Sequence, residues 1–197
     1  RVLDAYPGGG VPWKILDVIE ALRLSMQATI TDVANDLLRH MDDDGVIVSL
    51  MMDIFAAPES ASDRKRHMSQ IDGAAEALEP AARNRIHTFI ATAPLHMKYK
   101  LQTSPDEVHQ AVIDSVTRAR NRCDDVEWSA EDGTRTEHDF LCQVVESAIK
   151  AGARTINIPD TVGYTTPKEY GALIEYLSAR VAGAEGVLFS VHCHNDL

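Results

Sequence analysis

A chain of 197 residues, 45% of them hydrophobic and 25% charged, has the composition of one globular domain or of a piece of a larger one. Its formal charge of −11 argues against nucleic acid or an anionic membrane surface as a partner. The three cysteines lack the CxxC spacing of a metal site, and no apolar run approaches the roughly 18 residues of a membrane helix. We therefore expect a cytoplasmic protein with reduced thiols, whose composition suits small-molecule chemistry.

The first 70 residues show no regular alternation of strands and helices. Their patterns predict a loop at 8–10, helices at 15–24 and 30–38, a strand at 46–52 and an irregular polar stretch at 58–69. We therefore treat residues 1–70 as an atypical N-terminal segment.

A regular order of elements begins near residue 84. Runs of β-prone residues predict strands over 85–92, 126–129, 155–159 and 187–192. Between them, Ser104 followed by proline and two acids is a strong helix start, and Thr166 with a following proline starts another helix. A third helix is predicted over 138–151, with Gly152 as its stop.

The spacing of the strands predicts the fold class. Strand starts 30 to 40 residues apart are typical of βα units with a parallel sheet, in a barrel or in an open doubly wound fold. No GxGxxG or GxxxxGK[ST] follows a strand, so the nucleotide-binding form has no support. Polar clusters follow every strand, as in barrel enzymes. We therefore predict an incomplete (β/α)8 TIM barrel, with residues 1–70 in place of the first units and 71–197 as its central units.

His192 and His194 stand two residues apart at the end of the last predicted strand, so both imidazoles project to the same side. Two neutral imidazoles with a carboxylate and water suit Mn²⁺, Zn²⁺ or Mg²⁺, and the imidazoles disfavour Mg²⁺. The alternative is an exposed loop with two polar residues. The position at a strand end, followed by Asn-Asp, favours the metal site.

Two further candidates suit proton transfer or substrate orientation. Glu131, with Asp132, follows the strand 126–129, where a desolvated carboxylate can shuttle a proton. The alternative there is a solvated acidic loop. His87 shares a strand face with Phe89 and points into the barrel or into the helix layer. A hydrogen-bonded core residue is the alternative for His87.

Other polar residues near strand ends have simpler interpretations. Thr161 offers a hydroxyl and a backbone N–H that suit a carboxylate. His96, Lys98 and Lys100 are predicted to form a basic solvated face, with anionic substrate phosphates as the alternative. Cys193 points away from its flanking histidines and is expected to be packed rather than reactive.

Four segments resemble the signature of the bacterial 2-isopropylmalate synthase family. They are HTFIATAPLHMKYKL (87–101), DVEWSAED (125–132), TINIPDTVGY (155–164) and SVHCHND (190–196). The resemblance runs over residues 71–197, about two thirds of the chain. The wider family of homocitrate and citramalate synthases and hydroxymethylglutaryl-CoA lyase shares the HxHND end, whereas its HTFIAT and NIPDTVGY segments differ.

The resemblance implies a barrel that condenses acetyl-CoA with 2-oxoisovalerate to give 2-isopropylmalate in leucine biosynthesis. In that reaction a divalent metal chelates the 2-oxo acid and polarises its ketone. A base removes a proton from the acetyl methyl, the enolate attacks the ketone, and the thioester is then hydrolysed. The resemblance also leads us to expect a homodimer for the full-length protein.

The family's functional residues carry over onto positions at the predicted strand ends. These are His192 and His194 as metal ligands, Thr161 for the oxo-acid carboxylate, and His87, Ser129 and Glu131 as the lining of the substrate pocket. Glu131 and His87 are the catalytic candidates, and the identity of the base stays open.

One motif of the family is missing. Its first strand carries Arg-Asp-Gly, whose aspartate binds the metal and whose arginine stabilises the developing oxyanion, and this tripeptide occurs nowhere in the chain. Asp4 is the remaining candidate for the third ligand, while Leu3 stands where the arginine is expected. The second half of the barrel and a leucine-sensing domain are also missing from this sequence. We therefore expect an incomplete catalytic domain that condenses little or nothing alone.

Two alternatives stay open. One is a homocitrate or citramalate synthase relative, which differs only in the oxo acid. The other is a non-catalytic metal-binding or oligomerisation fragment.

Overall fold

A computed structural model of the chain describes residues 48–53 and 61–194. The predictions for residues 1–47, Asp4 among them, and for the Asn-Asp pair at 195–196 lie outside these described residues. No helix within the described ranges has the length and apolar character needed to cross a membrane.

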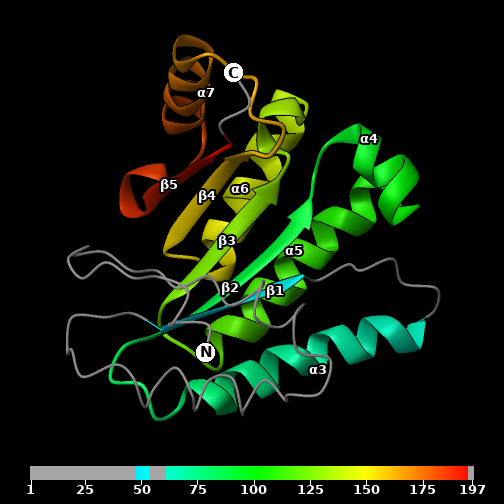
Figure 1. Cartoon of the computed structure of the whole chain (residues 1–197), viewed down its shortest axis with the longest axis vertical. Helices are drawn as coiled ribbons and strands as arrows, with labels where there is room; N and C mark the ends of the chain where they lie inside the picture. Colours follow the sequence, from blue (N-terminus) through cyan, green and yellow to red (C-terminus); the bar gives the residue numbers. More distant parts are fainter. Residues whose placement is uncertain (1–47, 54–60, 195–197) are drawn as a thin grey trace, which may run out of the picture.

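The strands of the described residues form one parallel sheet in chain order. They are β1 (Val48–Asp53), β2 (Asn84–Ala91), β3 (Val126–Glu131), β4 (Thr155–Asp160) and β5 (Leu188–Cys193). Each strand pairs in parallel with the next (Figure 1). A doubly wound sheet reverses its strand order at a switch point, whereas this order is unbroken. Within the described residues β1 and β5 are the two edges of the sheet, and together with the strand order this confirms the predicted incomplete barrel.

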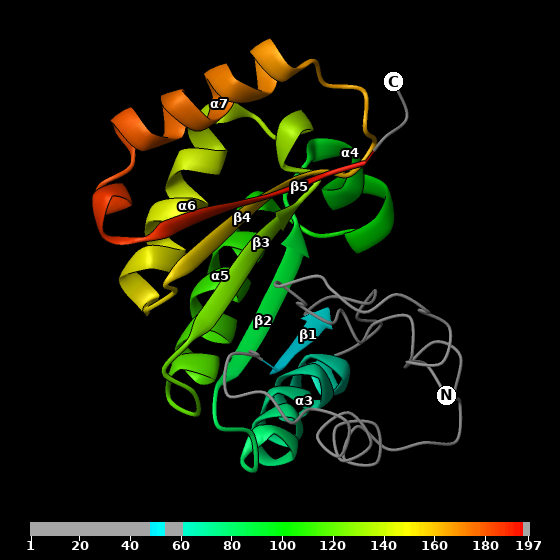
Figure 2. The same cartoon turned by 60° about the vertical axis from the view of Figure 1, so that its left-hand side comes forward.

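The helices cover the outer side of this curved sheet (Figure 2). Helices α3 (Ala61–Leu78), α5 (Pro105–Arg120) and α6 (His138–Ala151) each pack across the two strands that they connect. Helix α7 (Pro167–Arg180) follows β4. Short turns complete the chain: α4 (Pro94–His96), a π-helical turn (Met97–Leu101) and 3-10 turns at Gly133–Arg135 and Ala184–Gly186.

The predicted helix ends are confirmed by their capping interactions. Ser104 accepts a hydrogen bond from the backbone N–H of Glu107, whose carboxylate accepts one from the N–H of Ser104. Thr166 and Glu169 repeat this capping box at the start of α7. Gly152, at a φ of 112°, ends α6 in the left-handed conformation that favours glycine.

The prediction of an irregular stretch at 58–69 is wrong from Ala61 onwards, where α3 begins. Its apolar stripe lies in the second half of the helix, at Ile71, Ala74 and Leu78, all of them buried. The polar first half of α3 shows no amphipathic pattern, because the residues that pack into the core lie in its second half. The predicted strand at 46–52 is confirmed as β1, and the division at residue 70 stays a prediction, with α3 running across it.

Alternation along the strands gives the sheet two different faces. The face toward the helices carries fully buried apolar side chains such as Ile86, Trp128 and Ile156. Paired residues of neighbouring parallel strands share a face, so the register His87↔Glu127↔Thr155 marks the other, inner face. The inner face therefore carries polar side chains of neighbouring strands, among them His87, Glu127, Ser129 and Asn157.

A closed ionic cluster occupies the amino end of this face. The Arg85 guanidinium donates to Glu127 at 2.8 Å and to Asp125 at 3.0 Å, and Arg85 and Glu127 are both buried. Burial raises the pKa of the Glu127 carboxyl, and the charge of Arg85 offsets only part of this rise. We call Arg85, Asp125 and Glu127 the amino-end cluster.

Candidate metal and oxo-acid site

His192 is the next-to-last residue of strand β5, and His194 directly follows that strand. Both side chains are exposed. Their ring centroids are 5.0 Å apart. Two imidazoles bound to one ion at about 2.1 Å, with ligand angles of about 90–110°, would have centroids about 4.6–5.3 Å apart. The observed separation is compatible with one shared divalent ion.

A third ligand is not found in the part of the chain that the structure describes, where no group of three His, Cys, Asp or Glu residues could hold a metal ion. The predicted third ligand, Asp4, lies outside those residues. The described residues thus supply two candidate ligands, His192 and His194.

The loop after β4 packs directly against this pair. Asp160, which is buried, accepts hydrogen bonds from the N–H groups of Gly163 at 3.1 Å and Thr165 at 2.9 Å. Burial alone would raise the pKa of Asp160, but these bonds and one from the Thr134 hydroxyl hold it below its usual value. Gly163 has a φ of 71°, and a Cβ there would come within 2.8 Å of the His194 backbone. The loop conformation and a glycine are therefore both needed beside His194.

Thr161 begins this loop, next to the end of β3. Its hydroxyl oxygen accepts a hydrogen bond from the backbone N–H of Asp132 at 3.0 Å. The hydroxyl proton remains available to a ligand acceptor. The predicted contact of Thr161 with an oxo-acid carboxylate is compatible with this arrangement.

Glu131 is the last residue of β3, so the strand runs two residues past its predicted end at 129, and the alternative of a solvated acidic loop is wrong for Glu131. It faces inward with Ser129, and extending the register by two residues places it level with His192, two strands away. Two strand spacings amount to about 10 Å. Both carboxylate oxygens accept hydrogen bonds from Lys100 Nζ, each at 2.8 Å.

The neighbouring Asp132 points away from the inner face and is fully buried. Arg135 donates to both of its carboxylate oxygens, at 2.8 and 2.9 Å, and His96 Nε2 lies 3.2 Å from one of them. The hydrogen bond to Asp132 raises the pKa of Arg135. The predicted basic solvated face is therefore wrong for His96 and Lys100, which contact acids at and directly after the end of β3, and of the three only Lys98 is exposed.

A polar row crosses the inner face below these groups. His87 Nε2 and Ser129 Oγ are 2.6 Å apart, and Asn157 Nδ2 donates to the same Ser129 oxygen at 2.8 Å. All three residues are buried. The family resemblance predicted His87 and Ser129 in one pocket, and the structure brings these two side chains together. The contact of Asn157 with Ser129 was not predicted.

Cys193 lies on the other face of β5 from His192, as alternation predicts. Its side chain is exposed, so the prediction that it is packed is wrong.

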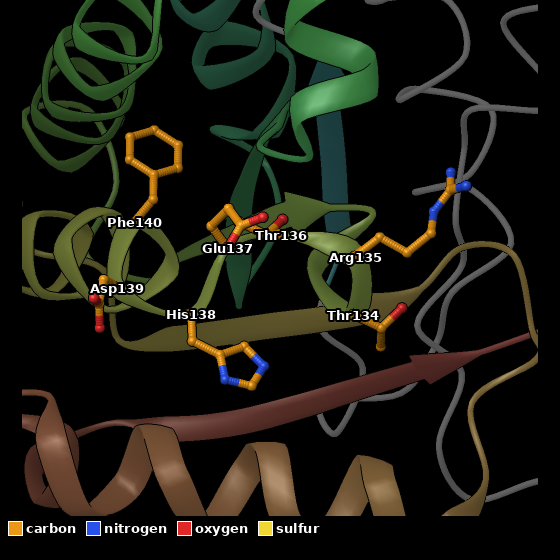
Figure 3. A pocket seen from close by; sticks show the side chains of 7 residues that line it. All are labelled: Thr134, Arg135, Thr136, Glu137, His138, Asp139 and Phe140. Carbon is orange, nitrogen blue, oxygen red and sulfur yellow. The ribbon is translucent and has the colours of Figure 1, made fainter.

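Two hollows lie on the helix side, near the turn that precedes α6. One, of about 610 Å³, is lined by residues 134–140 (Figure 3). The other, of about 480 Å³, lies between α6 and α7 and shares Thr134 and His138 with it. Figure 3 shows the His138 ring directed to the side on which α7 lies. None of the predicted site residues lines either hollow, so the candidate site is a separate feature of the inner face.

The profile of the HMGL-like family matches residues 48–197, which include every described strand. The chain belongs to the HMGL-like family. The match starts at β1, so the HMGL-like part of the chain begins before residue 71.

Several relatives of this HMGL-like chain carry the name 2-isopropylmalate synthase. One from Bradyrhizobium sp. (strain ORS 278) is 65% identical over 127 residues, and one from Rhodopseudomonas palustris (strain BisB18) is 61% identical over the same length. These matches cover 64% of this chain and 24% of each relative. The chain thus spans about a quarter of the length of these enzymes.

Solved structures of hydroxymethylglutaryl-CoA lyases share the fold. The enzyme from Brucella melitensis has a TM-score of 0.57 at 17% identity, covering 83% of this chain and 53% of the lyase. The enzyme from Pseudomonas aeruginosa has a TM-score of 0.56 at 16% identity, covering 82% and 49%. The HMGL-like chain therefore has the fold of about half of such an enzyme.

Proposed function

We propose that this chain is part of the catalytic barrel of a 2-isopropylmalate synthase, an acyltransferase that condenses acetyl-CoA with 2-oxoisovalerate. The observation that supports this proposal is that His192, His194, Thr161 and Glu131 lie at or directly after the carboxyl ends of neighbouring strands of the parallel sheet. These groups come from three consecutive strand ends. The identity of 61–65% with enzymes of that name over 127 residues supports it.

Each residue has a distinct part in this proposal. His192 and His194 would hold a divalent metal, which when bound supplies the Lewis acid that polarises the oxo-acid ketone. The imidazoles favour Mn²⁺ or Zn²⁺ over Mg²⁺. Thr161 donates its hydroxyl hydrogen bond to the oxo-acid carboxylate. Glu131 and His87 would orient the substrate and move a proton.

We expect this chain alone to condense little or nothing. The metal-binding aspartate and the arginine of the Arg-Asp-Gly motif have no counterpart in its sequence, apart from Asp4 as the candidate third ligand. Loss of a residue that merely orients a metal ligand costs about 10–100-fold in metal affinity, and loss of a ligand should cost more. A thiol-release assay with acetyl-CoA and 2-oxoisovalerate tests this, and normal turnover would contradict it.

Binding rather than turnover tests the proposed site itself. Calorimetry should show 2-oxoisovalerate binding that requires Mn²⁺ and that is lost in His192→Ala and His194→Ala. His138→Ala, which removes an exposed histidine on α6, is the matched control and should bind as the unchanged chain does. Metal-independent binding of the oxo acid would contradict the proposal.

The same titration separates the alternatives. Stronger binding of a different 2-oxo acid would assign the chain to a homocitrate or citramalate synthase relative. Metal binding without affinity for any oxo acid would indicate a non-catalytic metal-binding fragment.

A further inference from the structure

Lys100, which lies outside β3, contacts the Glu131 carboxylate directly. Lys100 Nζ donates to both oxygens at 2.8 Å, and 20% of the Glu131 side chain and 37% of the Lys100 side chain are exposed. A carboxylate that accepts one hydrogen bond on each oxygen keeps lone pairs on both oxygens for a further partner. Lys100 therefore fixes the carboxylate without using up its capacity to bind.

The turn that carries Lys100 is itself firmly anchored. Residues Met97 and Leu101 bury their side chains beneath the π-helical turn, while Lys98 between them is exposed. Gln102 ends the turn at a φ of 50°, in the left-handed region. Such π-helical turns are rare and often occur at functional sites.

A second contact, between His96 and Asp132, holds the same turn at the end of β3. His96 stands four residues before Lys100, so the two side chains leave the turn in similar directions. They bind consecutive acids of opposite orientation, His96 to the buried Asp132 and Lys100 to the inward Glu131. The His96 pair fixes the turn, and the Lys100 pair fixes the inward carboxylate.

We propose that Lys100 is a positioning residue of the active site, which holds Glu131 in the orientation that receives the oxo acid. The inference rests on the proposed function. The inference extends the proposed function, because it assigns a role to a residue of the β2–α5 connection. This residue, Lys100, has no described contact with the histidine pair or with Thr161.

The test uses calorimetry on the full chain at saturating Mn²⁺. Lys100→Met should weaken 2-oxoisovalerate binding about tenfold, while the affinity for Mn²⁺ changes less than twofold. Lys98→Met, on the exposed side of the same turn, should change neither affinity. Lys100→Arg should recover part of the loss, because a guanidinium can also contact both carboxylate oxygens.

Two further variants distinguish positioning from a general loosening of the turn. In a Glu131→Gln background, Lys100→Met should have no further effect, because the two substitutions act through one contact. His96→Asn should weaken oxo-acid binding less than twofold, although it loosens the turn. Additive effects in the first experiment, or a His96→Asn loss equal to that of Lys100→Met, would overturn the role of Lys100.

The failure of this inference differs from the failure of the proposed function. If the unchanged chain binds 2-oxoisovalerate with Mn²⁺ and Lys100→Met binds equally well, only the role of Lys100 is overturned. If the unchanged chain binds no oxo acid at all, the proposed function fails and the role of Lys100 fails with it.

Discussion

The two ends of the inner sheet face use similar charged groups in opposite ways. At the amino end, Arg85 and Glu127 are buried and bind one another. At the carboxyl end, His192 and His194 are exposed, and Glu131 keeps lone pairs beyond its contact with Lys100. One end is closed on itself, and the other can still bind a ligand.

This difference teaches how to separate structural from functional charges in a barrel. A buried charge with a complete set of partners stabilises or specifies the fold, whereas parallel strands gather reactive groups at their carboxyl ends. Variants at the amino-end cluster should therefore change stability, and variants at the carboxyl end should change binding.

The largest effect on stability is expected for Arg85→Met. The substitution leaves the Glu127 carboxylate buried without its partner, at a cost of about 3–5 kcal/mol. The folded-state pKa of Glu127 is already raised, so its contribution to stability is present below the unfolded pKa and is lost as pH rises. Without Arg85 that pKa should rise further, and urea unfolding should show a larger deficit at pH 8 than at pH 4.5.

Two controls test the cause of that deficit. Arg85→Met combined with Glu127→Gln should recover most of the loss, because no carboxylate is then left unpaired. Arg118→Met breaks an exposed ion pair with Asp72 and should cost at most about 1 kcal/mol. A double variant as unstable as Arg85→Met would show that the unpaired Glu127 carboxylate does not cause the loss of stability.

A smaller loss is expected for Asp160→Ala, which tests whether the carboxyl end also contains structural charges. The N–H groups of Gly163 and Thr165 lose their acceptor, at a cost of about 2–3 kcal/mol. The pKa of Asp160 is lowered, so its contribution is present above the unfolded value and is lost only below about pH 4. Denaturant unfolding should therefore show a smaller difference in the free energy of unfolding between the unchanged chain and Asp160→Ala at pH 3 than at pH 7. The same difference at both pH values would contradict this account.

The smallest effect on stability is expected for His192→Ala and His194→Ala. Both side chains are exposed, so the free energy of unfolding without metal should change by less than about 0.5 kcal/mol. The affinity for Mn²⁺ should fall more than about 100-fold, because a direct ligand is removed. Thermal unfolding with and without Mn²⁺ measures both quantities. A large loss of stability in the metal-free histidine variants would contradict the expected difference between this end of the sheet and Arg85.

The sequence alone predicted the elements with local signals. The capping boxes at Ser104 and Thr166 and the stop at Gly152 depend on neighbouring residues, and the structure confirms all three. Helix α3 was missed because its polar first half carries no apolar period. Its buried stripe begins only at Ile71.

The sequence predicted which candidate residues lie near the carboxyl ends of the strands, but not their side-chain contacts. His192, His194, Thr161 and Glu131 stood at strand ends, and a parallel sheet brings such ends together. The partner of Glu131 was missed because Lys100 lies 31 residues away in the chain. The spacing of His96 and Lys100, one helical turn apart, was the one available signal that both could reach the same neighbouring strand.

The most direct test of the metal site is paramagnetic broadening of backbone amide signals by substoichiometric Mn²⁺. The signals of Thr161, Gly163 and His194 should broaden first, whereas those of Ile86 and Val126 should persist, because they lie about 17–20 Å away along the strands. The broadening should disappear in His192→Ala. Broadening that starts at the amino-end cluster, or that survives in His192→Ala, would contradict the assignment of a metal site to the carboxyl end.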